Sequence, residues 1–264
     1  MASHSWKSLF VLGACAAWLL AGCGEGASTR AAKDQSVLSI EEALDHPKRP
    51  NADKEDDIIR KTSALFEFIG AAPGMTVFEI EAGRGYHTEV LSRLVGPDGR
   101  IIMHNPAPFD SFVGDAIEQR LENDRLANVR YSRSNFDVLD AEDNSVDLVT
   151  WILGPHELYF RPPGVETLGD VDAAYAEPFR ILKPGGAFII LDHAAPEGAS
   201  TESGGELHRI DPAVVKRLAQ AAGFELVEES DLLSNPEDQY ELSVFDPEVR
   251  RRTDRFLLKY RKPM

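Results

Sequence analysis

Residues 77–86 read VFEIEAGRGY, and this stretch determines the fold class. An apolar strand pattern ends in a loop that contains Gly83 and Gly85, and a helix pattern begins directly after the loop. Glycines at a strand-to-helix turn let the backbone approach a ligand closely, and the first turn of the helix presents unpaired N–H groups. We therefore predict a ligand-binding loop at this junction.

Strand and helix patterns alternate on both sides of the loop. Apolar strands are predicted at 75–80, 100–104, 129–132, 146–153 and 187–192. Helices are predicted at 51–70, 86–95, 111–123, 171–182 and 212–222, with turns at 96–99 and 183–186. Two last strands, 224–228 and 255–260, have no helix pattern of ordinary length between them and fit an antiparallel pair at one edge. Apolar strands separated by helices indicate a mostly parallel sheet that is covered on both faces.

The N-terminal sequence predicts export. Residues 9–23 read LFVLGACAAWLLAGC, an apolar run that is too short to span a bilayer comfortably. The small residues just before Cys23 resemble a bacterial lipoprotein processing box, which implies cleavage after residue 22 and a lipid on Cys23. A plain secretory signal or an uncleaved anchor is the alternative, and it also places the globular part outside the cytoplasm.

The expected organisation is therefore a signal peptide at 1–22, a lipidated cysteine and flexible tether at 23–50, and a single domain at 51–264. Both cysteines, Cys15 and Cys23, lie in the N-terminal part, so the domain has no disulfide and depends on its core. The formal net charge of −16 repels phosphate backbones, so nucleic acid is not expected as a partner. The lipid is the only membrane contact that we expect.

Two further motifs follow the glycine loop in order. Asp147-Leu148-Val149 lies in the fourth strand pattern, and residues 182–186 read LKPGG before the fifth. The acidic residue, glycine loop, DLV strand and LKPGG turn are together similar to the class I S-adenosylmethionine-dependent methyltransferases, over about residues 58–262. The resemblance implies an α/β Rossmann-like fold with a seven-stranded, mostly parallel sheet, an antiparallel last strand, and helices on both faces. It also implies S-adenosyl-L-methionine as the cofactor.

A second resemblance lies in the C-terminal half. LDHAA at 191–195, LHRID at 207–211, ESDLL at 229–233 and TDRF at 253–256 resemble an exported family of predicted methyltransferases. This resemblance implies the fold and names no methyl acceptor.

The methyltransferase resemblance implies a set of cofactor contacts with three departures from the family pattern. Glu81 stands where the loop normally has its first glycine, Asn105 where the second strand ends in a ribose-binding carboxylate, and Ser134-Asn135 where Gly-Asp contacts adenine. Amides replace charged acceptors at two of these positions, which could weaken binding by about 1–3 kcal/mol. Tyr86 and Phe136 either stack on the cofactor or belong to the core. The expected contacts are Glu79, Glu81, Ala82, Gly83, Arg84, Gly85, Tyr86, Asn105, Asn135, Phe136 and Asp137.

Four of the seven histidines are predicted at the carboxyl edge of the sheet, where open α/β sheets bind ligands. They are His87, His156, His193 and His208, and Glu157, Tyr159 and Asp192 accompany them. We assign His156, His193, His208 and Tyr159 as candidate catalytic residues, because a histidine can take a proton from a methyl acceptor. Two or three histidines could instead hold a divalent metal, or simply hydrogen-bond within loops. No close histidine pair marks a metal site, so no metal ligand is assigned.

The loop at 154–164 carries aromatic residues and prolines that suit a small organic acceptor. The glycine- and serine-rich stretch at 196–206 is either a mobile cover or a surface loop. The sequence thus predicts a lipid-anchored S-adenosylmethionine-dependent methyltransferase that acts on a small molecule. A non-catalytic binding protein with a degenerate fold, and a metal-dependent activity at the histidine edge, remain as alternatives.

Overall fold

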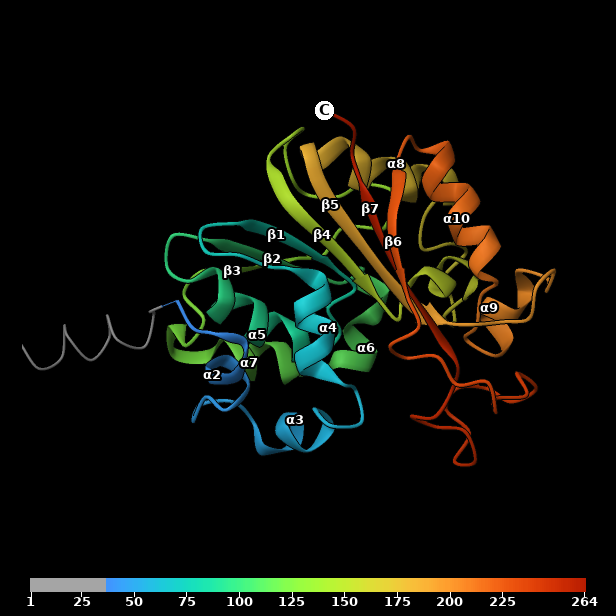
Figure 1. The fold of residues 1–264 in the computed structure, drawn as a ribbon, viewed down its shortest axis with the longest axis horizontal. Helices are drawn as coiled ribbons and strands as arrows, with labels where there is room; N and C mark the ends of the chain where they lie inside the picture. Colours follow the sequence, from blue (N-terminus) through green and yellow to red (C-terminus); the bar gives the residue numbers. More distant parts are fainter. Residues whose placement is uncertain (1–36) are drawn as a thin grey trace, which may run out of the picture. The chain divides into compact units, whose positions relative to one another are not determined.

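The computed structural model describes residues 37–264, and the predictions for the signal peptide and Cys23 lie outside the described residues. A seven-stranded sheet has the order β3-β2-β1-β4-β5-β7-β6 (Figure 1). Its strands are β1 Thr76–Ile80, β2 Arg100–His104, β3 Val129–Ser132, β4 Val146–Ile152, β5 Leu182–His193, β6 Glu225–Ser230 and β7 Arg255–Arg261. Strands β1 to β5 pair in parallel, whereas β7 is antiparallel to β5 and β6. The predicted fold, including the antiparallel last strand, is confirmed.

Helices surround the sheet. They are α2 Ile40–Leu44, α3 Asn51–Asp56, α4 Thr62–Ile69, α5 Tyr86–Val95, α6 Asp110–Val113, α7 Ala116–Leu121, α8 Val171–Ile181, α9 Glu202–Glu206 and α10 Pro212–Ala221. Short 3-10 turns lie at η1 Ala107–Phe109, η2 Glu122–Asp124 and η3 Pro155–Tyr159. Among residues 37–264 no helix is both long and apolar enough to cross a membrane.

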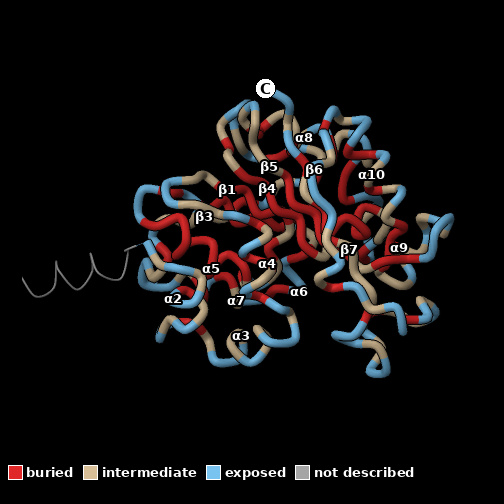
Figure 2. The backbone as a smooth tube through the Cα atoms, viewed as in Figure 1, coloured by how far each residue is buried: buried red, intermediate tan, exposed pale blue. Residues whose placement is uncertain are grey.

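The two larger of the three hydrophobic clusters among the described residues form because successive strand residues point to opposite faces of the sheet. In β1, Val77 joins the core that contains α4 and α5, whereas Phe78 joins the core that contains α8 and α10. Trp151 of β4 is fully buried in the second of these cores. The buried backbone in Figure 2 therefore follows the central strands and the helix faces turned toward them.

Three elements begin and end where the sequence placed them, namely α5, β2 and β3. The single helices predicted at 51–70 and 111–123 are wrong. Lys61 is in the left-handed conformation between α3 and α4, and the side chain of Ile58 just before it is 88% exposed. Gly114, also at positive φ, separates α6 from α7.

Two segments are more ordered than the sequence suggested. The predicted turn at 183–186 lies inside β5, where the N–H of Gly185 donates to the carbonyl of Lys262 after β7. Residues 37–50, expected within the tether, include α2, which begins with a capping box formed by Ser39 and Glu42. Ala43 of α2 is fully buried in the core beside α5, so the folded part begins before residue 51.

The sheet ends in β3 on one side and in β6 on the other. Strand β6 reads ELVEES, and its residues Glu225, Glu228 and Glu229 are exposed. Strand β3 exposes Arg130.

Candidate functional site

The glycine loop, residues 81–85, joins β1 to α5 at the carboxyl edge of the sheet. Both glycines of the loop are left-handed, with φ of 55° at Gly83 and 80° at Gly85. A Cβ atom on Gly85 would lie 2.9 Å from side-chain atoms of Arg120 and Met103, so this glycine permits close packing. A Cβ atom on Gly83 would meet no atom within 4 Å. The backbone at Gly83 therefore faces open space, which a ligand could enter.

Asn105 holds the loop in place from the end of β2. Its side chain is fully buried, its Oδ1 accepts the N–H of Gly83 at 2.8 Å, and its Nδ2 donates to the Gly83 carbonyl at 3.0 Å. An amide carries one donor group and one acceptor, which match the two polar groups of a single peptide residue. The expected role of Asn105 as an acceptor for ribose hydroxyls does not agree with this geometry, because both of its polar groups bind the loop.

Glu81 adopts the conformation of the glycine that it replaces. Its φ is 55°, a strained region for a residue with a side chain that costs about 1–3 kcal/mol. Its carboxylate accepts the indole N–H of Trp151 at 3.2 Å and fills the space beside Gly154, where a Cβ atom would lie 2.3 Å from Glu81 Oε2. Burial and the negative charge of Glu157 raise the pKa of Glu81 well above its usual range. The side chain thus occupies the corner between β1 and the end of β4.

Glu79 points toward α5. Its carboxylate accepts a hydrogen bond from Thr88 Oγ1 at 2.5 Å, and burial raises the pKa of Glu79 to about 8. The acidic residue of the predicted motif therefore connects β1 to the helix that follows it.

The two aromatic residues that could stack on a cofactor are otherwise engaged. The Tyr86 hydroxyl donates to Asp57 at 2.5 Å, and its ring lies beneath the guanidinium groups of Arg49 and Arg60, at 5.3 and 4.5 Å. Phe136 is 1% exposed and belongs to the core around Trp151. The core alternative therefore holds for Phe136, and Tyr86 joins the loop to the segment before α4.

The remaining predicted cofactor contacts differ in how far they are exposed to solvent. Arg84 and Asn135 are exposed, and Ala82 is buried. Asp137 is partly buried, and its carboxylate accepts the N–H of Asp170, the N-cap of α8. Only the exposed pair leaves side chains available at the surface.

A buried charge network behind the loop was not predicted. Glu89 of α5 is fully buried and pairs with Arg93, Arg120 and Arg125, at 2.7–2.8 Å. Arg120 also donates from Nε to the carbonyl of Arg84 at 2.8 Å. The three arginines come from α5, α7 and the turn after η2, so only the folded chain brings them together.

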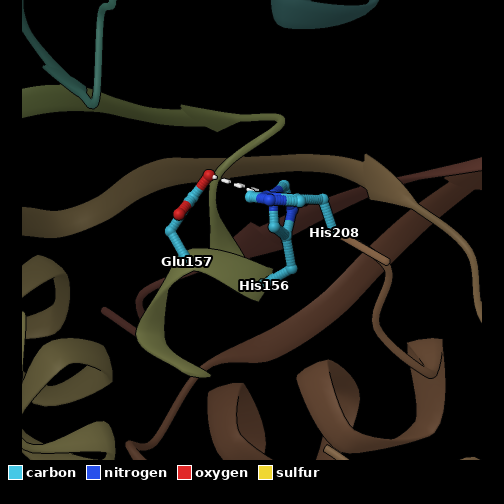
Figure 3. Close-up of side chains that lie close together, drawn as sticks. All are labelled: His156, Glu157 and His208. Atoms are coloured by element: carbon cyan, nitrogen blue, oxygen red, sulfur yellow. Dashed lines mark hydrogen bonds and ion pairs between the residues drawn. The ribbon is translucent and has the colours of Figure 1, made fainter. Parts of the chain in front are cut away.

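Several predicted edge residues meet after β4 and β5. His156 donates from Nδ1 to Asp192 Oδ1 at 2.7 Å, and its backbone N–H donates to Asp192 Oδ2 at 2.8 Å. Its Nε2 lies 3.2 Å from Glu157 Oε1, and His208 Nδ1 lies 3.2 Å from the same oxygen. Figure 3 shows the carboxylate of Glu157 and both rings directed toward one another. Burial alone would lower the pKa of His156, but Asp192 and Glu157 raise it to about 10.

Three other predicted residues make their hydrogen bonds or packing contacts outside this cluster. His193 hydrogen-bonds Thr253 Oγ1 through Nδ1 at 2.7 Å, and burial together with the charge of His156 lowers its pKa well below the usual range. Tyr159 lies against α9, where Gly204 leaves room for its side chain. His87 of α5 is buried against Phe66 of α4, and burial lowers its pKa to about 3. His87 therefore does not join the edge cluster.

The ubiE/COQ5 methyltransferase family model matches residues 56–231 of the chain. Among curated proteins, the ubiquinone/menaquinone biosynthesis C-methyltransferase UbiE of Shewanella halifaxensis is 30% identical over 131 residues, which are 50% of this chain and 47% of that protein. The protein of the same name from Teredinibacter turnerae is 28% identical over 158 residues, 59% of each chain. The chain thus spans about half the length of the curated relatives that it matches.

Solved structures share the fold. A SAM dependent methyltransferase from Aquifex aeolicus has a TM-score of 0.57 and 15% identity, over 85% of this chain and 99% of that one. The [4+2]-cyclase SpnF has a TM-score of 0.56 and 19% identity, over 78% of this chain and 81% of that one. At these identities the likeness establishes the class I methyltransferase fold alone.

Proposed function

Because the chain belongs to the ubiE/COQ5 methyltransferase family, whose cofactor is S-adenosylmethionine, we propose that it transfers a methyl group from this cofactor to a small-molecule acceptor. The relatives are named C-methyltransferases, which supports a carbon atom of the acceptor as the methylated position. The single observation that carries the proposal is the glycine loop, where the backbone of Gly83 faces open space at the start of α5.

The loop residues fit the proposed cofactor through their main chain. Two left-handed glycines directly before α5 offer the close approach that such a ligand needs. The Asn105 amide holds Gly83 through both of its polar groups and so fixes the conformation of the loop. No carboxylate follows β2 to accept ribose hydroxyls, and the loss of one such charged acceptor costs about 1–3 kcal/mol.

When bound, the cofactor supplies a methyl group carried on a positively charged sulfur. The chain would then hold the acceptor in line with that methyl group, and positioning supplies most of the rate enhancement. The turn η3 and helix α9 pack against each other beside the histidines and form the wall of the proposed acceptor site. Asp192 and Glu157 raise the pKa of His156 to about 10, so we do not assign this ring as the proton acceptor. Burial and the charge of His156 lower the pKa of His193 well below its usual range, which makes it a weak proton acceptor, so we assign no general base.

Replacing Gly83 with valine tests the proposal. The new side chain would enter the open space in front of the loop, so we expect the affinity for S-adenosylmethionine to fall by about 100-fold or more, which is about 2.7 kcal/mol. Titration calorimetry of the full chain with S-adenosylmethionine and S-adenosylhomocysteine measures the change. Gly74→Val is the matched control, because Gly74 also has a positive φ and open space but precedes β1 at the opposite edge of the sheet.

If Gly83→Val and Gly74→Val bind S-adenosylmethionine with equal affinity, the cofactor binds elsewhere. If the unmodified chain binds neither compound at millimolar concentration, the alternative of a non-catalytic protein with a degenerate fold replaces the proposal. The occupied amide of Asn105 and the side chain at Glu81 are the observations that favour this alternative.

We also propose that the protein is exported and anchored by a lipid on Cys23. The apolar run at 9–23 and the small residues before Cys23 support this proposal. Cys23→Ala should abolish labelling by a radioactive fatty acid and release the protein from membranes. Cys15→Ala is the control, because this cysteine lies inside the predicted signal and should leave labelling unchanged. An unlabelled wild-type chain would contradict the lipid anchor.

A further inference from the structure

Three side chains at the end of β4 and after β5 direct metal-binding atoms toward one point. They are His156, Glu157 and His208, and one ligand atom from each lies within 4.8 Å of the other two (Figure 3). His156 and Glu157 belong to η3, whereas His208 lies 51 positions beyond Glu157 in the sequence. The spacing in the sequence therefore contains no metal motif, and the fold alone assembles the group.

A second observation points to a missing partner. Glu157 is 8% exposed, and its Oε2 is buried without a hydrogen-bond partner. Its Oε1 is shared by two imidazole rings at 3.2 Å. A buried carboxylate oxygen without a partner costs about 1–3 kcal/mol, and a cation bound between the carboxylate and the rings would remove that cost.

Asp192 is hydrogen-bonded to the ring nitrogen of His156 that faces away from Glu157, and metal-binding histidines usually have such a carboxylate partner. Asp192 is fully buried and accepts the Nδ1–H of His156, which leaves Nε2 as the atom directed toward Glu157. Asp192 also accepts the backbone N–H groups of His156 and His193, so its own position is fixed. Such a carboxylate–histidine pair fixes the ring and its tautomer for a metal ion.

We propose that His156 Nε2, His208 Nδ1 and the Glu157 carboxylate bind one divalent transition-metal ion, with Zn²⁺ as the fitting ion. Two imidazoles and one carboxylate suit Zn²⁺ or Fe²⁺, whereas Mg²⁺ and Ca²⁺ prefer oxygen ligands alone. Three protein ligands leave at least one coordination position open. This is the arrangement of a catalytic zinc site rather than a structural one.

The site adjoins the glycine loop because β4 pairs directly with β1. His208 is flanked by Phe160 and Phe245, with ring centroids 5.0 and 4.8 Å away, and Phe245 is 60% exposed. An apolar rim beside an open metal position suits an organic molecule that binds the ion through a hydroxyl or carbonyl oxygen. The ion would polarise that oxygen and lower its pKa.

Metal binding by the full chain, measured without any methyl donor, tests this inference separately from the proposed function. The chain is first stripped with EDTA and then titrated with Co²⁺ and Zn²⁺. Co²⁺ reports its ligands through visible absorption, and Zn²⁺ content after dialysis reports the stoichiometry. We expect one ion per chain, with Mg²⁺ unable to displace it.

Two substitutions remove single ligands, and a third is the control. His208→Ala and Glu157→Gln should each weaken metal binding by about 100-fold or more. Loss of a residue that only orients a metal ligand typically weakens metal binding by about 10- to 100-fold, so loss of a ligand itself should cost at least as much. His193→Gln should retain the ion, because His193 is adjacent but hydrogen-bonds Thr253 instead. Circular dichroism of each variant verifies that the fold is retained.

Equal metal affinity in the two ligand variants and the control would overturn the inference, as would less than about one ion per ten chains in the wild type. A wild type that binds the ion but no S-adenosylmethionine would leave the metal site standing and remove the methyltransferase proposal instead.

Discussion

Glu89→Ala is expected to lower the free energy of unfolding by about 3–5 kcal/mol, the usual cost of removing one partner from a buried ion pair. Glu89 is fully buried and neutralises Arg93, Arg120 and Arg125 at 2.7–2.8 Å. Without it, Arg93 and Arg120, both less than 10% exposed, would remain charged inside the protein. Urea unfolding of the full chain at neutral pH measures the change.

The same substitution should affect the glycine loop. Arg120 holds the carbonyl of Arg84 and packs against Gly85, and Glu89 holds Arg120. Hydrogen exchange at Gly83 and Gly85 should therefore accelerate in the variant. Glu118→Ala on α7 is the control, because Glu118 is exposed and its loss should change stability by no more than about 0.5 kcal/mol. Similar effects of the two substitutions would show that the buried network contributes little.

Asp238→Ala is expected to lower the free energy of unfolding by a comparable amount, about 3–5 kcal/mol. Arg209 and Asp238 are both buried, and Arg209 Nη1 donates to Asp238 Oδ2 at 2.8 Å. The same carboxylate accepts the backbone N–H groups of Tyr240 and Asp254, so it connects the segment after β6 to the start of β7. Its loss would leave a buried guanidinium without its carboxylate partner and two partly buried N–H groups without their acceptor.

The loss of stability caused by Asp238→Ala should depend on pH. Burial alone would raise the pKa of Asp238, but hydrogen bonds from Arg209 and from backbone N–H groups lower it below its usual value. The charged form is thus favoured in the folded state, so its stabilisation is complete above the unfolded pKa of about 3.9 and is lost as the pH falls through the folded value. The difference between wild type and variant should shrink below pH of about 4.

Thermal unfolding between pH 3 and pH 7 checks this dependence. Glu237→Ala is the neighbouring control, because Glu237 is exposed and its carboxylate makes no hydrogen bond among those that the structure describes. A difference between wild type and Asp238→Ala that stays constant over this range would contradict the assigned role of the Asp238 charge.

The strands and the long helices were predictable because their signals are local. The apolar run before Gly83 and the alternation of strand and helix patterns determine the order of the elements and the ligand-binding edge. The helix interruptions at Lys61 and Gly114 were missed because hydrophobic spacing continues through both positions. The capping box at Ser39 and Glu42 is a local signal as well, and it marks the early start of the fold.

The roles of individual site residues were harder to predict because they depend on contacts between distant segments. Asn105 was placed correctly at the end of β2, but its pairing with Gly83 follows from the parallel register of β1 and β2. The meeting of Glu157 with His208 depends on the path of the chain after β5. A pattern along the sequence identifies which edge such residues share, and only the three-dimensional contacts identify their partners.

The two outer strands of the sheet bear on the behaviour of the protein at high concentration. Unpaired edge strands can recruit strands from other molecules, and charged side chains along an edge oppose such pairing. Strand β6 presents Glu225, Glu228 and Glu229 to solvent, and β3 presents Arg130. Docking β6 against β6 of a second molecule would bring two rows of glutamates together and would compete with the ion pairs that Glu228 and Glu229 form with Lys259 and Lys216. The protein is thereby protected against sheet-to-sheet aggregation at the edge that the antiparallel pair creates.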